Sequence, residues 1–84
     1  MSPHKNPEII IYFCECALHG LMLMDIERLI AGKFGIELTR RKLGQVKLES
    51  ERILKAPSNF RHWFREADAL RVNLDKYKEE NSRV

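Results

Sequence analysis

The residues that end helices constrain this chain most. Gly20, Gly35 and Pro57 divide it into four segments, and each segment spaces its apolar residues as an α-helix does. No hairpin turn signal lies between the segments, so no β-wing is expected. The sequence therefore predicts an all-α fold, a small four-helix domain. With 84 residues, the chain has room for a single domain over 1–84.

The first helix is predicted from its start signal. Asn6 can cap a helix, and Pro7 suits the first helical position. The helix should run to about His19. The β-branched and aromatic run 9–13 leaves a strand as an alternative, but the apolar spacing that continues beyond it favours a helix. Residues 1–5 are expected to form a flexible tail.

Two cysteines, Cys14 and Cys16, lie two positions apart. On a helix their side chains diverge by about 200°, so this geometry disfavours a disulfide between them. Together with His19 they have the composition of a metal site, but no second ligand pair follows, and buried reduced thiols are the favoured interpretation. No metal or cofactor is expected. Without a secretion signal or a membrane-length apolar run, the sequence predicts a cytoplasmic protein with no membrane partner.

Two further helices are predicted around a short apolar corner. Asp25 can cap the second helix, which should end at Gly35. Thr39 can cap the third helix, which should run to about Lys55. We expect the apolar side chains of the corner, 36–38, to pack beneath both helices.

A C-terminal amphipathic helix is predicted over 57–81, capped by Ser58 or Asn59. Its apolar residues alternate at three and four positions, as in a heptad seam, and should pack against the domain or form a homodimer contact. An alternative is that its aromatic residues stack on single-stranded nucleic acid, but aromatic residues at this spacing are more often buried. The seam consists of Phe60, Trp63, Phe64, Ala67, Leu70, Leu74 and Tyr77.

Basic residues concentrate between Lys33 and Lys55. This segment carries seven basic and three acidic residues, a net charge of +4, whereas the whole chain carries +3, so the remaining residues sum to −1. Three of the basic residues, 40–42, are consecutive. Such a distribution permits nucleic-acid binding.

The segment 25–55 resembles the helix-turn-helix DNA-binding superfamily. In that pattern a small residue precedes a glycine by four positions, and two apolar corner residues, a Ser or Thr cap and an apolar helix residue follow. The matching residues here are Ala31, Gly35, Ile36, Leu38, Thr39 and Leu43. The resemblance implies a three-helix core over 6–56, in which the second and third helices cross closely and the third enters a DNA groove.

Placing Leu43 inward predicts which residues of the third helix face DNA. Arg41 and Gln45 suit base edges, with Gly44 between them for close approach and Leu48 beside them. Contacts to the DNA backbone are expected from Thr39, Arg40, Lys42, Lys47 and Arg52.

An ordinary solvated helix face is the alternative interpretation of this surface. Against it, Gly44 costs roughly 1 kcal/mol relative to alanine inside a helix. Leu48 is apolar on the expected wet side, and the cations 40–42 adjoin the positive end of the helix dipole. We therefore expect a protein that binds double-stranded DNA as a regulator of transcription or accessory factor. The sequence shows no catalytic motif, so no enzymatic activity is expected. A helical protein–protein interaction module, an adaptor or inhibitor docking on a larger complex, is the alternative.

Overall fold

The computed structural model describes residues 2–82. Four α-helices account for most of them, and two short 3-10 turns, η1 and η2, accompany the helices. The predicted all-α fold with four helices is confirmed, and residues 2–82 contain no strand. In chain order the elements are η1 (Pro3–Lys5), α1 (Pro7–Leu18), α2 (Leu23–Phe34), α3 (Arg40–Leu54), η2 (Phe60–His62) and α4 (Ala67–Asn81).

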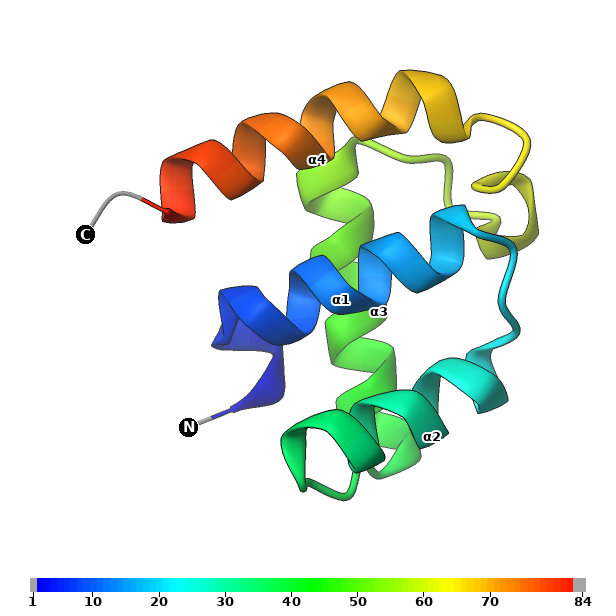
Figure 1. The fold of residues 1–84 in the computed structure, drawn as a ribbon. Coiled ribbons are helices and arrows are strands. Elements are labelled where there is room, and N and C mark those ends of the chain that lie inside the picture. Colours follow the sequence, from blue (N-terminus) through cyan, green and yellow to red (C-terminus); the bar gives the residue numbers. More distant parts are fainter. Residues whose placement is uncertain (1, 83–84) are drawn as a thin grey trace.

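The helices form two layers. In Figure 1, α3 passes behind α1, while α2 crosses near the N-terminal end of α3 and α4 near its C-terminal end. α3 packs directly against α1 and α4, whereas α2 packs chiefly against α1. The shortest extent of the backbone is 18 Å, which fits two layers of helices whose axes lie about 8–10 Å apart. One side of α3 is therefore not covered by any other helix of residues 2–82.

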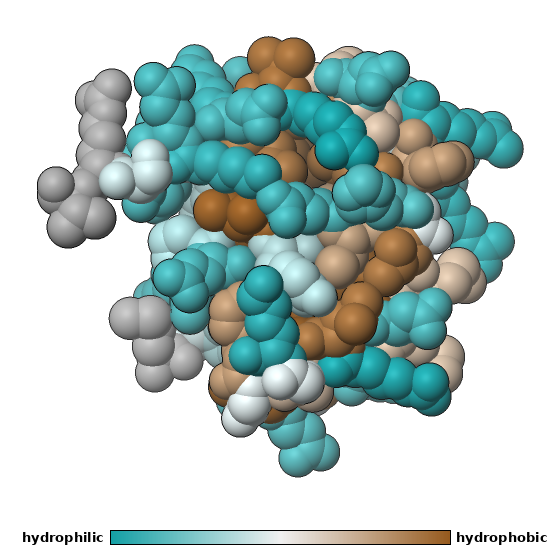
Figure 2. Space-filling model, in the orientation of Figure 1, coloured by the Kyte–Doolittle hydropathy of each residue, from teal (hydrophilic) through white to brown (hydrophobic). Residues whose placement is uncertain are grey.

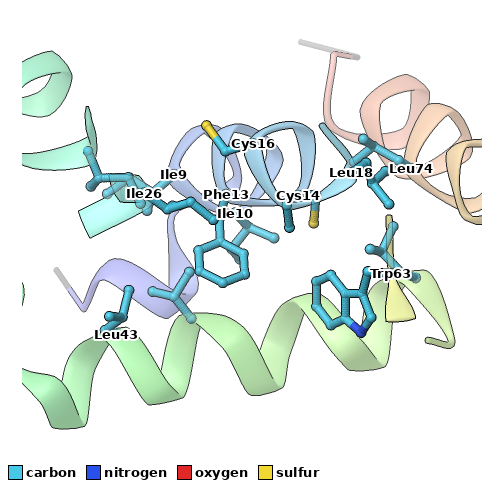
Figure 3. Packing of buried hydrophobic residues seen from close by; sticks show 14 of the residues in the cluster. Ile9, Ile10, Phe13, Cys14, Cys16, Leu18, Ile26, Leu43, Trp63 and Leu74 are labelled. Carbon is cyan, nitrogen blue, oxygen red and sulfur yellow. The ribbon is translucent and has the colours of Figure 1, made fainter. Parts of the chain in front are cut away.

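The core is built around α1, which is apolar on nearly every side. Figure 3 shows Ile10, Phe13 and Cys14 pointing from α1 towards α3, and all of these side chains are buried. Burial of each large apolar side chain contributes about 1.5–3 kcal/mol to folding. Figure 2 views the molecule from the side of α1, where the surface is mostly hydrophilic, with apolar side chains exposed across the middle and at the top.

The start of α1 agrees with the sequence. Asn6 caps the helix, because its side-chain oxygen accepts a hydrogen bond from the Glu8 backbone N–H at 3.0 Å, and Pro7 occupies the first helical position. The residues before it differ from the expected tail. Pro3–Lys5 form η1, Pro3 is buried, and η1 packs against α1 and α3. Residue 1 lies outside the described residues.

The start of α2 corrects one predicted cap. The helix begins at Leu23, and Asp25 lies inside its first turn instead of capping it. Met22 occupies the cap position and makes no side-chain hydrogen bond there. The physical reason is packing: Leu23 is half-buried against the core, so the helix begins at Leu23 although a polar cap residue follows it.

The continuous C-terminal helix over 57–81 is a second correction. Asn59 does act as a cap, but of η2, where its side chain accepts from the Arg61 backbone N–H at 3.1 Å. After a turn, α4 begins only at Ala67. The break allows Trp63 to enter the core, where it is fully buried and its Nε1–H donates to the Pro57 carbonyl oxygen at 3.0 Å.

The break also divides the predicted seam. Trp63, Leu70 and Leu74 are buried within one chain, where α4 packs against α1 and α3. Phe60, Ala67 and Tyr77 are half-buried beside them, whereas Phe64 is 59% exposed and leaves the seam. The seam residues other than Phe64 therefore pack against their own chain, and a homodimer would need a surface other than these residues.

Candidate nucleic-acid interface

The corner before α3 fixes where that helix starts. α2 ends at Gly35, whose φ of 64° lies in the left-handed region that favours glycine. Leu38 is buried, and Thr39 caps α3 by accepting a hydrogen bond from the Lys42 backbone N–H at 3.2 Å. The predicted end of the second helix and the predicted cap of the third are confirmed. As a result, the basic run 40–42 forms the exposed first turn of α3.

The predicted close crossing of α2 and α3 is wrong. A Cβ atom added at Gly35 would meet no heavy atom within 4 Å, so this glycine serves the backbone angle and not a close approach. α2 packs chiefly on α1 because its buried residues, Ile26 and Ile30, belong to the core around α1. A hollow of about 350 Å³ separates the first turns of α2 and α3, and Leu23, Met24, Leu43 and Gly44 are among its lining residues.

The outward face of α3 gathers the residues predicted to contact bases. Leu43 and Val46 are buried, which turns the opposite side of the helix towards solvent. Leu48 is 63% exposed on that side. The predicted orientation of the helix is confirmed. Four exposed residues follow one another at intervals of four, three and four, and we refer to them as the outward face of α3: Arg41, Gln45, Leu48 and Arg52.

Gly44 flanks this face without a packing role inside the chain. A Cβ atom added there would meet no heavy atom within 4 Å, and its φ is not positive. Alanine would therefore fit, and it would favour the helix by roughly 1 kcal/mol. Neither sterics nor backbone conformation within residues 2–82 explains the glycine.

The basic residues of α3 fall into two groups. Lys47 pairs with Glu51 at 2.8 Å, and Arg52 pairs with Glu49, which raises the pKa of Arg52 through a hydrogen bond. The run 40–42 has no carboxylate partner among residues 2–82. Three uncompensated cations at the positive end of a helix repel one another and interact unfavourably with the helix dipole. An anion placed there would relieve both interactions.

The aromatic residues considered for stacking are not assembled as an exposed platform. Trp63 lies in the core, with ring centroids 6.2 Å from Phe13 and 5.2 Å from Phe60. Phe64 is exposed on a different segment from α3. These rings belong chiefly to the core.

Both cysteines are buried residues of α1, as the core interpretation predicted. Their side chains point to different sides of the helix in Figure 3. Burial raises the pKa of Cys14 to about 12 and also raises that of Cys16. No cluster of three or more metal-ligating side chains occurs between residues 2 and 82. In the same range, no helix combines the length and the apolar content that crossing a bilayer requires.

The fold brings together a second group of cations, which the sequence did not indicate. Lys5, Lys55 and Lys76 line hollows at the C-terminal end of α3, beside Arg52 and Tyr77. They come from η1, from the residue after α3 and from α4, so no local pattern brings them together. Only Lys55 lies within the basic segment that the sequence singled out.

Comparison with family models, with curated proteins and with solved structures finds no match for this chain.

Proposed function

We propose that this protein binds double-stranded DNA through the outward face of α3 and acts as a non-enzymatic regulator of transcription or accessory factor. One observation carries the proposal: the cations 40–42 form an exposed first helical turn, lack carboxylate partners within residues 2–82, and include Arg41, which lies one turn before the exposed side chain of Gln45. A polyanion would neutralise this turn and favour the dipole of α3.

The roles follow from side-chain chemistry. The Arg41 guanidinium can donate two hydrogen bonds to a guanine edge, and the Gln45 amide can pair with an adenine edge. Gly44 lets the DNA approach the helix backbone, and Leu48 suits the methyl group of thymine. Phosphate contacts are assigned to Thr39, Arg40, Lys42, Lys47 and Arg52.

The proposal includes a helix-turn-helix arrangement with α3 as the recognition helix. The order of α2, a glycine-ended corner and a capped α3 supports it. In this chain α1 and α4 are the main supports of α3, and α2 contributes less.

Amide chemical shifts measured during titration with duplex DNA test the proposal. At about 50 mM salt, where contacts to phosphate are strong, a duplex should shift the resonances of 39–52 more than those of α1. No detectable affinity for any duplex at that salt concentration would refute the proposal.

Replacing both Arg41 and Gln45 by alanine tests which face binds. The double variant should keep its helical circular dichroism, because both side chains are exposed, and should lose at least tenfold in affinity, since one good base contact is worth about 1–3 kcal/mol. Arg65→Ala removes the same charge from an exposed position outside α3 and should bind as the unaltered protein does. Equal affinities of the double variant and the control would contradict the assignment of this face.

A second candidate function is docking on a protein partner. The exposed apolar side chains of Leu48 and Met24, and the hollow beside Gly44, favour it. A partner helix with apolar anchors would use this surface. The two functions differ in one measurement: for a docking module, duplex DNA should produce no localised shifts in α3 at about 50 mM salt, where phosphate contacts are strongest.

A further inference from the structure

The C-terminal end of α3 adjoins two hollows that share Arg52 and Tyr77. One, of about 340 Å³, lies between the end of α3 and α4, and the other, of about 400 Å³, lies between α3 and η1. In Figure 1, η1 and the C-terminal half of α4 lie on the same side of α3. Four cations from these elements line the hollows, and we refer to them as the distal basic cluster: Lys5, Arg52, Lys55 and Lys76.

The distal basic cluster has an excess of positive charge. Two carboxylates, Glu49 and Glu80, also line the hollows, which leaves a net charge of +2 against the four cations. Glu49 is engaged by Arg52. Lys5, Lys55 and Lys76 are exposed and have no carboxylate partner among the residues that the structure describes.

Lys55 occupies a position that favours glycine. Its φ of 53° lies in the left-handed region, and Lys55 is the one residue other than glycine with a positive φ between residues 2 and 82. A cation here does complement the negative end of the helix dipole, but Arg52 in the last turn already serves that purpose. The strained lysine therefore places a positive charge at the junction of α3 and the hollows.

Arg52 connects this cluster to the outward face of α3, because it belongs to both. α3 has 15 residues and is therefore about 22 Å long at 1.5 Å per residue. The major groove is about 12 Å wide and 8.5 Å deep. When the first turns of such a helix contact bases, its last turn leaves the groove and reaches the phosphates at the edge.

We propose that the distal basic cluster is a second phosphate-contact site, which holds the sugar–phosphate backbone of the same duplex whose bases α3 contacts. This inference rests on the proposed function. DNA would thus be held at both ends of α3, by 40–42 at one end and by the cluster at the other. The contacts at the far end come from three separate segments, so they position the whole domain on the duplex.

The salt dependence of duplex binding tests the second site. We compare the double variant Lys55→Gln/Lys76→Gln with the control Arg61→Gln/Arg65→Gln, which loses the same charge from exposed positions around η2. The slope of log affinity against log salt concentration is negative, and each lost phosphate contact makes it less steep by about 0.9. We expect a slope less steep by about 1.8 in the double variant and an unchanged slope in the control, with thermal unfolding of all three proteins alike.

The outcomes separate the two proposals. If the unaltered protein binds DNA but the double variant and the control give the same slope, the second site is wrong and the proposed function stands. If the unaltered protein binds no duplex, both fail. The amide chemical shifts of Lys55, Lys76 and Tyr77 provide a second measurement. Changes with an equimolar duplex, and none with inorganic phosphate at the same concentration, support the site. Equal shifts with phosphate alone would overturn it in favour of a small-anion site.

Discussion

Gly44 is the residue at which folding stability and the proposed DNA binding make the most directly opposed demands. Because a Cβ atom there meets no heavy atom within 4 Å, we expect Gly44→Ala to raise the free energy of unfolding by about 0.5–1 kcal/mol in urea titrations. If α3 binds DNA as proposed, the same change should weaken that binding, since the added methyl group would hold the duplex away from the backbone. A variant that is more stable and binds DNA unchanged would show that nothing approaches Gly44 closely.

Cys14 makes stability depend on alkaline pH. Burial raises its pKa in the folded protein from 9.0 to about 12. In the unfolded chain the thiol ionises near pH 9, whereas the folded protein retains the proton. The unfolded state therefore binds fewer protons between these values, and stability falls as the pH rises through that window.

The contribution of Cys14 is measurable by subtraction. Between pH 8 and pH 10 it should lower the free energy of unfolding by about 1.4 kcal/mol, the equivalent of one pKa unit. Cys14→Ala lacks this dependence but retains that of every other group, so the difference between the two proteins should change by that amount. A difference that stays constant with pH would mean that the thiol is not held neutral by the fold.

Among the helices, α3 is the one whose first turn most needs a cap for its stability. Thr39 satisfies one backbone N–H of the first turn, and the run 40–42 makes that turn electrostatically unfavourable. We expect Thr39→Ala to lower the free energy of unfolding by about 1 kcal/mol. Thr39→Ser keeps the hydroxyl and should retain nearly all of the stability. Urea titrations of the two variants compare these values, and equal losses would show that the hydroxyl does not cap α3.

The element boundaries also show how far sequence reasoning reached. Starts and ends that depend on neighbouring residues were predicted correctly, as at Asn6, Gly35 and Thr39. Boundaries that depend on distant packing were not. Leu23 joins α2 because it contacts the core, and the helix expected over 57–81 breaks because Trp63 turns inward. The outward face of α3 was predictable, because a buried Leu43 fixes the orientation of the entire helix.

At the scale of the whole molecule, α4 completes the core of its own chain. Leu74 is buried against α1 and α3, so Leu74→Ala should lower the free energy of unfolding by about 2–5 kcal/mol. Leu48→Ala, the same change at an exposed position, should stay within about 0.5 kcal/mol. In sedimentation experiments, the folded fraction of either variant should have the same solution mass as the unaltered protein. A loss of mass in the Leu74 variant would identify the seam as a dimer contact.

The distal basic cluster also depends on the whole fold, because its cations come from separate segments of the chain. The sequence therefore did not indicate it. Lys5 and Lys76 lie near opposite ends of the chain and line two separate hollows that share Arg52 and Tyr77, because η1 and α4 both pack against α3. No periodicity within a single helix encodes that proximity. The basic run 40–42, by contrast, is local and was visible directly.

The buried indole of Trp63 gives the protein a built-in optical reporter. It is the single tryptophan of the chain, it is fully buried, and its Nε1–H is held by the Pro57 carbonyl oxygen. Its fluorescence emission therefore reports the integrity of the core and not the solvent at the outward face of α3. One sample can then report unfolding through emission and the proposed DNA binding through a dye on the duplex, which keeps loss of binding separate from loss of fold.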